Sequence, residues 1–316
     1  MIIEIVPYNP AWPKDFEAEA KQIKQVLDDD CLTVHHIGST SVEGLAAKPI
    51  IDILATVKDI SIIDEYNNAM RSIGYESKGE YGIPFRRFFT KGYPKKLYHL
   101  HIFEETDSSA NHHLLFREYL RNNPKALQEY EALKKALALS VNKDKKPQDG
   151  IMHEYTLGKD RFIRTILNKA GFDSLRLAMA THFKEWEEYH RIRKGQIFEP
   201  LNIAYDQNHL TLKDPSHFHF VLLKGADILS VAHLEIMSET DVALRSLATD
   251  EPYKKQGFGR AMMELLERWL KLRGIKILKI HASLRAEEFY RKLGYDNMPF
   301  NDPSISKEVV NLGKVL

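Results

Sequence analysis

A glycine-rich turn between a predicted strand and a predicted helix limits what the C-terminal half of this chain can fold into. The strand spans Val242 to Ala248, the turn contains Gly257-Phe258-Gly259, and a helix begins at Arg260. Glycine lets the backbone turn sharply and approach a ligand, and the first N–H groups of a helix point outward at the positive end of its dipole. The segment is therefore predicted to cradle an anion such as pyrophosphate. A plain glycine turn with basic residues in solvent is the alternative for the loop taken alone.

The length of the chain indicates two domains. It has 316 residues, and single hydrophobic cores stop growing at about 250–300 residues. A helical run from Gly150 ends at Ala170, and a mixed pattern of strands and helices begins at Leu175. We therefore expect two α/β (α+β) domains, residues 1–172 and residues 173–316.

Charge and cysteine content restrict the partners and the compartment. The formal net charge of +1 argues against nucleic acid or a membrane as a partner. Cys31 is the one cysteine, which excludes an internal disulfide and a cysteine-rich zinc site. The start of the chain lacks the pattern of a signal peptide, and no apolar run approaches the length of a membrane span. A cytoplasmic location is the expectation.

Hydrophobic periodicity predicts most of the elements. In the N-terminal half we expect a short strand over Ile2–Val6, a helix over Phe16–Leu27 and a strand over Pro49–Val57 that is buried on both faces. In the C-terminal half, three strands separated by short turns predict an antiparallel meander over 218–223, 227–237 and 242–248.

Two segments carry a resemblance to a known family. The loop Lys254-Lys255-Gln256-Gly257-Phe258-Gly259 is similar to the Gln/Arg-x-x-Gly-x-Gly/Ala motif of the GNAT acetyltransferase superfamily. Lysine replaces Gln/Arg at the first position, which keeps the positive charge. Downstream, Ala286 to Tyr295 resembles the Phe-Tyr-x-x-x-Gly-Phe/Tyr segment of the same family. The resemblance covers roughly residues 175–300 and implies a GNAT fold with a splayed central sheet.

This resemblance implies transfer of an acetyl group from acetyl-CoA to a small amine. Tyr290 matches the tyrosine that often protonates the departing thiolate, and packing beside Phe289 is the alternative role. Backbone groups of the strand end would pair with the pantetheine arm, and the loop amides would hold the pyrophosphate. The expected cofactor-binding residues are Leu247, Ala248, Thr249, Lys254, Lys255, Gln256, Gly257, Phe258, Gly259 and Arg260.

Glu235 is the candidate catalytic base. Its neighbours Leu234 and Ile236 face the opposite side of the predicted strand, so its carboxylate can face the acceptor cleft. A position on a solvated sheet face is the alternative.

Other polar residues of this half have open roles. His217 and His219 share one strand face, but the sequence shows no third metal ligand, so no metal is assigned to them. Arg245 either contacts an acidic group of the acceptor or pairs with Asp241. The segment from Thr181 to Gln207 is expected to choose the acceptor, and its pattern does not name one.

A lone carboxylate marks the N-terminal half. One strand ends in Gly38-Ser39, and the apolar strand that follows contains Asp52. A charge in an apolar strand is costly unless it binds a metal or a cation, so Asp52 is a candidate site residue. A buried ion pair with Lys48 or Arg87 is the alternative.

This half resembles the GrpB-like family, relatives of the nucleotidyltransferase fold, and so implies a mixed sheet with helices. The resemblance spans roughly residues 3–168 and includes the segments Pro7–Pro13, His36–Asp52, Tyr98–His101 and Phe116–Arg121. Active nucleotidyltransferases hold magnesium with Asp-x-Asp, but here the second position is Leu54, which argues against nucleotidyl transfer. Mg²⁺ stays an option for this domain. A phosphate-bearing or nucleotide-like ligand is expected to contact Gly38, Ser39, Thr40, Lys48, Asp52, Arg87, His99 and His101.

Three functions are compatible with these features. The first is an N-acetyltransferase whose N-terminal domain binds the phosphate-bearing ligand. The second is a nucleotidyltransferase or nucleotide-binding protein whose C-terminal domain only binds or senses CoA. The third is a non-catalytic CoA-binding protein.

Overall fold

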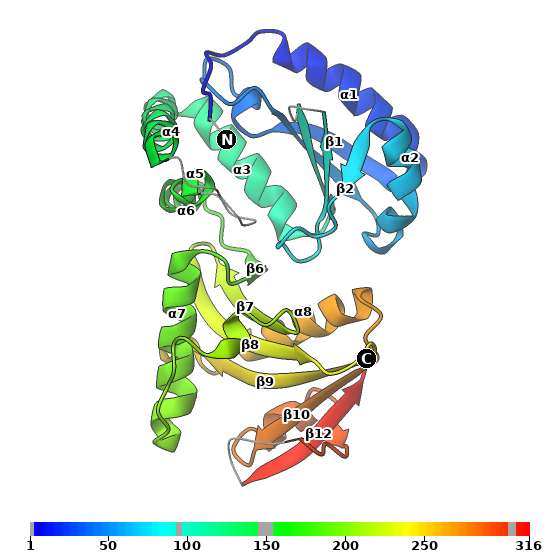
Figure 1. The fold of residues 1–316 in the computed structure, drawn as a ribbon, viewed down its shortest axis with the longest axis vertical. Coiled ribbons are helices and arrows are strands. Elements are labelled where there is room, and N and C mark those ends of the chain that lie inside the picture. The colour runs from blue at the N-terminus through cyan, green and yellow to red at the C-terminus, as the bar shows by residue number, and fades with distance from the viewer. Residues whose placement is uncertain (1–2, 93–96, 145–153, 303–307) are drawn as a thin grey trace. The chain divides into compact units, whose positions relative to one another are not determined.

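The chain forms two compact units, Met1–Ser174 and Leu175–Leu316, each built on its own sheet (Figure 1). A computed structural model describes residues 3–92, 97–144, 154–302 and 308–316, without the side chains of 142–144 and 154. Both units mix helices with strands, as the sequence predicts. Within these ranges, no helix is long and apolar enough to cross a membrane.

The sheet of the N-terminal unit has the strand order β1-β2-β5-β4-β3. Its strands are β1 (Cys31–Ile37), β2 (Ile51–Val57), β3 (Tyr75–Ser77), β4 (Arg87–Lys91) and β5 (Tyr98–Glu104). Strands β2 and β5 are parallel, and the other neighbours are antiparallel. Strand β2 lies between β1 and β5 and is buried except at Asp52, which confirms the strand predicted to be buried on both faces.

Helices and short turns complete this unit. They are α1 (Trp12–Leu27), η2 (Ser39–Ser41), η3 (Ser61–Tyr66), α2 (Asn67–Ser72), α3 (Ser108–Asn122), α4 (Pro124–Asp144), α5 (Glu154–Leu157) and α6 (Asp160–Lys169). The strand expected over Ile2–Val6 does not form a ladder among the described residues. Val6 makes an isolated bridge with Ala47, and Pro7 directly after it has no N–H with which to extend pairing.

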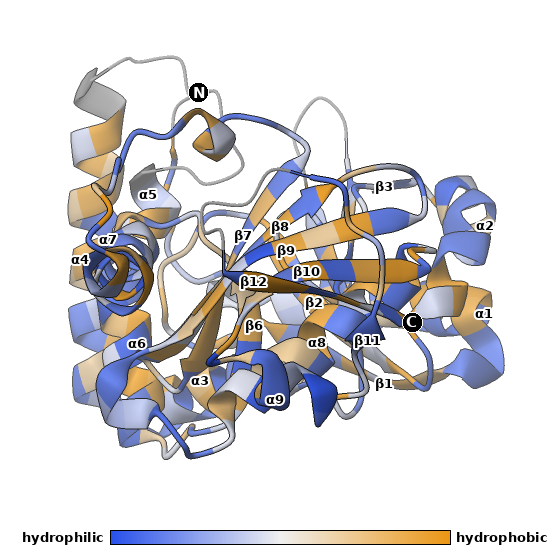
Figure 2. Ribbon diagram, turned by 90° about the horizontal axis from the view of Figure 1, so that it is seen from below, coloured by the Kyte–Doolittle hydropathy of each residue, from blue (hydrophilic) through white to orange (hydrophobic). Residues whose placement is uncertain are grey.

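The sheet of the C-terminal unit has the order β11-β12-β10-β9-β8-β7-β6. Its strands are β6 (Leu175–Met179), β7 (His217–Lys224), β8 (Asp227–Ile236), β9 (Asp241–Thr249), β10 (Ile277–Ser283), β11 (Asp296–Asn297) and β12 (Val309–Val315). Strands β7, β8 and β9 form the predicted antiparallel meander. Much of the hydrophobic colour in Figure 2 lies on these strands.

Helices and short helical turns connect the strands of the C-terminal sheet and cover its faces. They are α7 (Phe183–Arg193), the π-helical turn η4 (Lys194–Phe198), η7 (Glu251–Tyr253), α8 (Phe258–Leu272) and α9 (Glu287–Arg291). Helix α8 buries apolar residues at three- and four-residue spacing, among them Met262, Leu266 and Trp269. The Trp269 ring contacts Phe218 and Phe220 of β7, which places α8 on one face of the sheet.

Helix α7 covers the opposite face. Tyr189 and Ile192 pack in one cluster with Val221, Val231 and Ala248 of strands β7, β8 and β9. The His182 side chain caps the start of the helix, and the Glu185 carboxylate accepts a hydrogen bond from the His182 backbone N–H. The polar residues that share the α7 face of β7 and β8 therefore lie under this helix and the turn that follows it.

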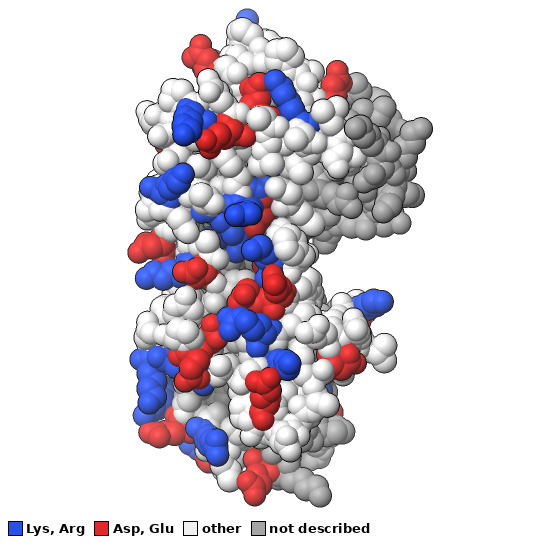
Figure 3. Space-filling view, turned by 90° about the vertical axis from the view of Figure 1, so that its left-hand side faces the viewer, with Lys and Arg blue, Asp and Glu red and all other residues white. Residues whose placement is uncertain are grey.

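Charged side chains are mixed on the surface. On the face drawn in Figure 3, lysines and arginines alternate with aspartates and glutamates in each unit, which fits the formal net charge of +1.

Candidate functional site

The turn between β9 and α8 leaves a row of backbone N–H groups without carbonyl partners. Lys255 and Gly257 have positive φ, 61° and 88°. Ala261 N donates to Gly257 O at 3.0 Å, whereas within the described chain the amides of residues 256–260 donate to no backbone carbonyl. Such amides at the start of a helix bind anions because they add to the positive end of the dipole. The predicted anion cradle therefore has the necessary donors.

The second glycine of the motif allows close packing. A Cβ at Gly259 would lie 3.4 Å from Thr249 Oγ1 and 3.5 Å from the Phe289 ring. A Cβ at this position would make ordinary van der Waals contact with the end of β9 and with α9, and a side chain longer than that of alanine would push these elements apart.

Charged side chains hold the base of this loop, and other charged side chains lie exposed around it. Asp250 accepts from the Glu251 amide at 3.0 Å and from both terminal nitrogens of Arg191, at 3.0 and 2.7 Å. Lys254 pairs with Glu251 at 2.6 Å. Lys255, Arg260 and Gln256 are exposed at the loop. Arg191 of helix α7 holds the base of the loop through Asp250, a contact that no sequence pattern indicated.

Strands β9 and β10 separate beside this loop. Their parallel pairing runs from Asp241–Ile277 to Leu244–Ile280 and then stops, although β9 continues to Thr249. A register shift between His233 and Leu234 of β8 leaves Arg245 as an extra residue on β9. The β10-facing backbone of residues 245–249, which includes Leu247, Ala248 and Thr249, thus lines a gap in the sheet. This is the splayed sheet that the sequence resemblance implies.

Tyr290 lies on α9 in a buried position. Its ring packs edge-on against Phe289 and Tyr295, at centroid distances of 5.0 and 5.8 Å. Burial raises the pKa of the Tyr290 hydroxyl above its ordinary value. Within the described residues, no hydrogen-bond partner accompanies this hydroxyl, whereas the hydroxyl of Tyr295 donates to Glu267 at 2.9 Å. A protonated hydroxyl without a hydrogen-bond partner in the described residues is suited to donating a proton.

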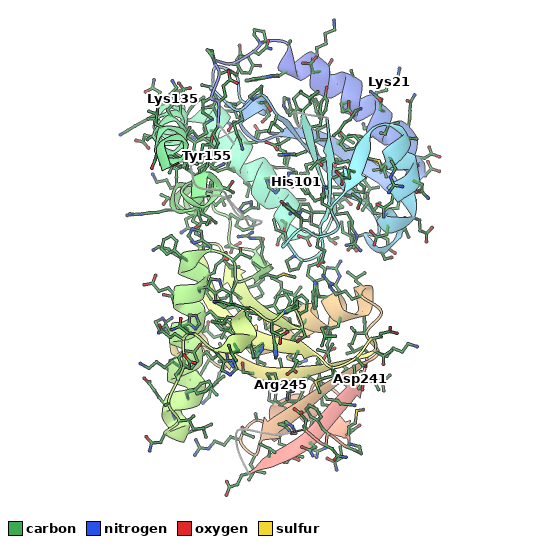
Figure 4. The ribbon with its side chains drawn as sticks, in the orientation of Figure 1. Lys21, His101, Lys135, Tyr155, Asp241 and Arg245 are labelled. Carbon is green, nitrogen blue, oxygen red and sulfur yellow. The ribbon has the colours of Figure 1, made fainter. Side chains whose placement is uncertain are left out.

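The predicted base Glu235 is already engaged on one side. Arg245 Nε donates to its Oε2 at 2.5 Å, and the same guanidinium also pairs with Asp302. Arg245 is labelled with Asp241 on β9 in Figure 4, but Asp241 pairs with Lys279 at 2.6 Å. The alternative in which Arg245 pairs with Asp241 is therefore wrong. Glu235 Oε1 lies 3.8 Å from His217 Nε2 and is the freer oxygen.

Beside Glu235 the hydrogen bonds fix the protons of two histidines. Arg193 only donates, so His233 Nδ1, 3.3 Å away, accepts. Burial, together with Arg193, lowers the pKa of His233, so the ring is neutral and its proton lies on Nε2. Nε2 then donates to His217 Nδ1 at 2.8 Å. His233 was missed by the sequence analysis because a histidine in an apolar strand gives no pattern of its own.

His219 belongs to the same layer. Its Nε2 donates to Thr211 O at 3.1 Å, so its Nδ1 accepts from the Tyr189 hydroxyl at 2.8 Å. Burial lowers the pKa of His219 to about 4. Within the described ranges, no group of three or more His, Cys, Asp or Glu side chains is arranged to hold a metal ion, here or in the N-terminal unit.

In the N-terminal unit, Asp52 lies near the start of β2, opposite Ile37 at the end of β1. Gly38 has a φ of 69°, and a Cβ there would collide with the Asp52 carboxylate. His99 Nδ1 donates to Asp52 Oδ1 at 3.1 Å, and the side chain of Asp52 is 31% exposed. Burial disfavours the charge, but the His99 bond and the charges of Lys48 and Lys159 outweigh it, and together they lower the Asp52 pKa.

Two lysines and two tyrosines surround this carboxylate. The amines of Lys48 and Lys159 lie 4.9 and 4.5 Å from the centroid of the Tyr155 ring, which is labelled in Figure 4. Ser39 hydrogen-bonds Tyr130, whose pKa is raised by burial. Burial, then the charge of Lys48, lowers the pKa of Lys159 to about 8. Among the described residues neither amine has a salt-bridge partner, so positive charge exceeds negative charge here.

Three predicted ligand residues have other partners. Arg87 makes two bonds of 2.8 Å to Asp64, on the sheet face opposite Asp52. The Thr40 hydroxyl is engaged by His36 at 3.0 Å and the Ile50 carbonyl at 3.4 Å. His101 shares the face of Asp52 and contacts Arg86 at 3.2 Å.

The structure thus gathers only part of the predicted set. It brings together Gly38, Ser39, Lys48, Asp52 and His99. It adds Lys159 and Tyr155, which no local pattern indicated because they are about a hundred residues away, beside α6 and on α5. Mg²⁺ has no set of side-chain ligands among the described residues.

Known proteins match the two units separately. The model of the GrpB protein family matches residues 2–169, and that of the acetyltransferase (GNAT) family matches residues 176–295. The UPF0157 protein YqkA of Bacillus subtilis is 41% identical over 163 residues, 52% of this chain and 46% of that protein. The chain therefore spans less than half the length of this relative.

Solved structures are similar to each half. The conserved protein GrpB from Enterococcus faecalis is 43% identical, with a TM-score of 0.48, covering 53% of this chain and 96% of its own. An acetyltransferase from Thermus thermophilus is 19% identical, with a TM-score of 0.39, covering 46% and 99%. With the GrpB model matching more than half of its residues, the chain belongs to the GrpB protein family and carries a GNAT acetyltransferase domain after the GrpB domain.

Proposed function

We propose that this protein transfers an acetyl group from acetyl-CoA to a small amine in its C-terminal domain. The observation that carries the proposal is the row of free amides at residues 256–260 directly beside the gap between β9 and β10. The amides suit the pyrophosphate, and the open edge of β9 suits the amide groups of the pantetheine arm. The residues present therefore fit acetyl-CoA, which supplies the activated acyl group when bound.

Three side chains of the chain serve the reaction in this proposal. Tyr290 donates a proton to the departing thiolate, because its hydroxyl is protonated and uncommitted. Glu235 accepts the proton of the attacking amine through the oxygen that faces His217. Arg245 holds the other Glu235 oxygen and thereby orients the carboxylate.

The test is acetyl transfer itself. The full chain is incubated with labelled acetyl-CoA and a panel of small amines, and in parallel with labelled nucleotides and Mg²⁺. We expect labelled N-acetyl products and no nucleotidyl transfer. Binding of CoA without any product would favour the CoA-sensing alternative, and nucleotidyl transfer would favour the nucleotidyltransferase alternative.

We propose further that the N-terminal domain binds a phosphate-bearing ligand. The excess of positive charge from Lys48 and Lys159 beside Asp52 supports this, as does the start of η2, where the Ser39 and Thr40 amides donate to no backbone carbonyl in the described chain. Calorimetric titration with pyrophosphate and with ATP tests it. Lys48→Gln should weaken binding of both probes, and unchanged affinity would contradict the site.

A further inference from the structure

Arg193 places a guanidinium on the acceptor side of the C-terminal sheet. It is the last residue of α7, and it reaches His233 in the middle of β8, forty residues further along the chain. Its guanidinium carbon lies 5.8, 5.5 and 6.0 Å from the ring centroids of Tyr189, Phe198 and Tyr205. Aromatic rings from helix α7, turn η4 and the loop after it therefore lie around this half-buried charge.

No carboxylate balances this charge within the described chain. Arg193 donates to His233 and to the hydroxyls of Tyr189 and Tyr205, all of which are neutral. Its Nε is buried and has no hydrogen-bond partner. A half-buried cation whose partners are all neutral lacks the opposite charge that would compensate best for its lost hydration.

The other charged groups beside Arg193 pair with one another. Arg245 binds both Glu235 and Asp302. Burial lowers the pKa of both His219 and His233, so these two rings are neutral. Arg193 is therefore the cation of this group that has no carboxylate partner in the described chain.

Arg193 contacts β8, the strand next to β9, whose other edge lines the gap. Its partner His233 is paired with Ser246 on β9, one residue before Leu247, in the stretch where β10 no longer pairs with β9. A small molecule that is held at Arg193 and extends across β9 would reach the region where the acetyl group is presented.

From these observations we infer that the acceptor is a small amine that also carries a carboxylate, and that Arg193 binds this carboxylate. This inference rests on the proposed acetyl transfer. A carboxylate matches one guanidinium in charge and in its planar, two-pronged geometry. A phosphate group, with a charge of about −1.5 to −2, would require further cations that this face lacks.

Matched acceptors test the inference. The full chain, saturated with acetyl-CoA, is given a mixture of the twenty amino acids or the mixture of their carboxamides, and the N-acetyl products are measured by mass spectrometry. We expect the free acids to react at least ~10-fold faster than the amides, because only the acids pair with Arg193. Arg193→Gln should raise KM for the acids by a similar factor and leave the amides unchanged.

Two controls accompany this variant. Lys194→Gln removes the adjacent exposed charge, which lies 3.7 Å from Glu199 at the surface, and should keep the preference for acids. CoA affinity, measured by calorimetry, should be the same in Arg193→Gln as in the original chain. If Arg193→Gln fails to fold, Arg193→Lys keeps the charge but loses the two-pronged contact, and should show a smaller preference.

The outcomes separate the two proposals. Equal rates for acids and amides, or an undiminished preference in Arg193→Gln, would overturn the carboxylate site while leaving acetyl transfer intact. If neither mixture yields a product, the panel of small amines decides acetyl transfer, and thermal unfolding of the CoA-saturated protein decides the inference. A Tm raised by the acids, not by the amides, and lost in Arg193→Gln would support it, and no rise would overturn it.

Discussion

Among single residues, Tyr290 has the proposed role that one substitution tests most directly. Tyr290→Phe keeps the ring contacts with Phe289 and Tyr295 and removes only the proton donor. We expect kcat to fall by about 10²-fold, the usual contribution of a general acid, with CoA affinity nearly unchanged. Steady-state kinetics and calorimetry measure the two quantities.

Tyr295→Phe is the matched control. Its hydroxyl donates to Glu267 in the interior, so its loss should lower the free energy of unfolding by about 1–3 kcal/mol and leave kcat unchanged. A normal kcat in Tyr290→Phe would return Tyr290 to a packing role.

Also at this scale, Lys159 predicts how pH affects the N-terminal site. Burial and Lys48 lower its pKa to about 8, so the amine is charged below that pH and loses its charge as the pH rises through it. Affinity for pyrophosphate should therefore fall between about pH 7 and pH 9, as measured by calorimetry. Lys159→Arg stays charged and should abolish this fall. A pH-independent affinity in the original chain would exclude Lys159 from the site.

At the scale of elements, the start of α8 carries the prediction for CoA. Gly257 has a φ of 88° and lies among the free amides. Gly257→Glu introduces a strained side chain and a negative charge facing the pyrophosphate, and should abolish CoA binding in calorimetry. Lys271→Glu also introduces a negative charge, but at the exposed far end of the same helix, so this variant should bind CoA normally. Retained CoA affinity in Gly257→Glu would refute this placement.

At the scale of the whole molecule, the two sites are expected to be chemically independent. Asp52→Asn removes the charge that His99, Lys48 and Lys159 surround, and should alter pyrophosphate affinity without changing CoA affinity or acetyl transfer. Circular dichroism and thermal unfolding check that the fold persists. Loss of the folded state would instead identify Asp52 as a structural ion-pair residue.

Features that depend on neighbouring residues could be predicted from the sequence. The meander of β7, β8 and β9 follows from alternating apolar residues, and the cradle follows from Gly257 and Gly259, because periodicity and glycine act over a few residues. The departure at Leu54 and the lone carboxylate Asp52 were visible for the same reason. The strand over Ile2–Val6 was not correctly predicted, since apolar content alone does not provide a pairing partner.

Contacts between side chains that are far apart in the sequence became known from the fold. It placed Arg87 on the face opposite Asp52, brought Lys159 to that carboxylate, and joined Arg191 to Asp250 across 59 positions. It also left Arg193 half-buried without a carboxylate partner in the described chain. These contacts depend on the strand order and on which sheet face a helix covers. Both are set by the sum of many weak packing contacts. No local sequence pattern therefore encodes them.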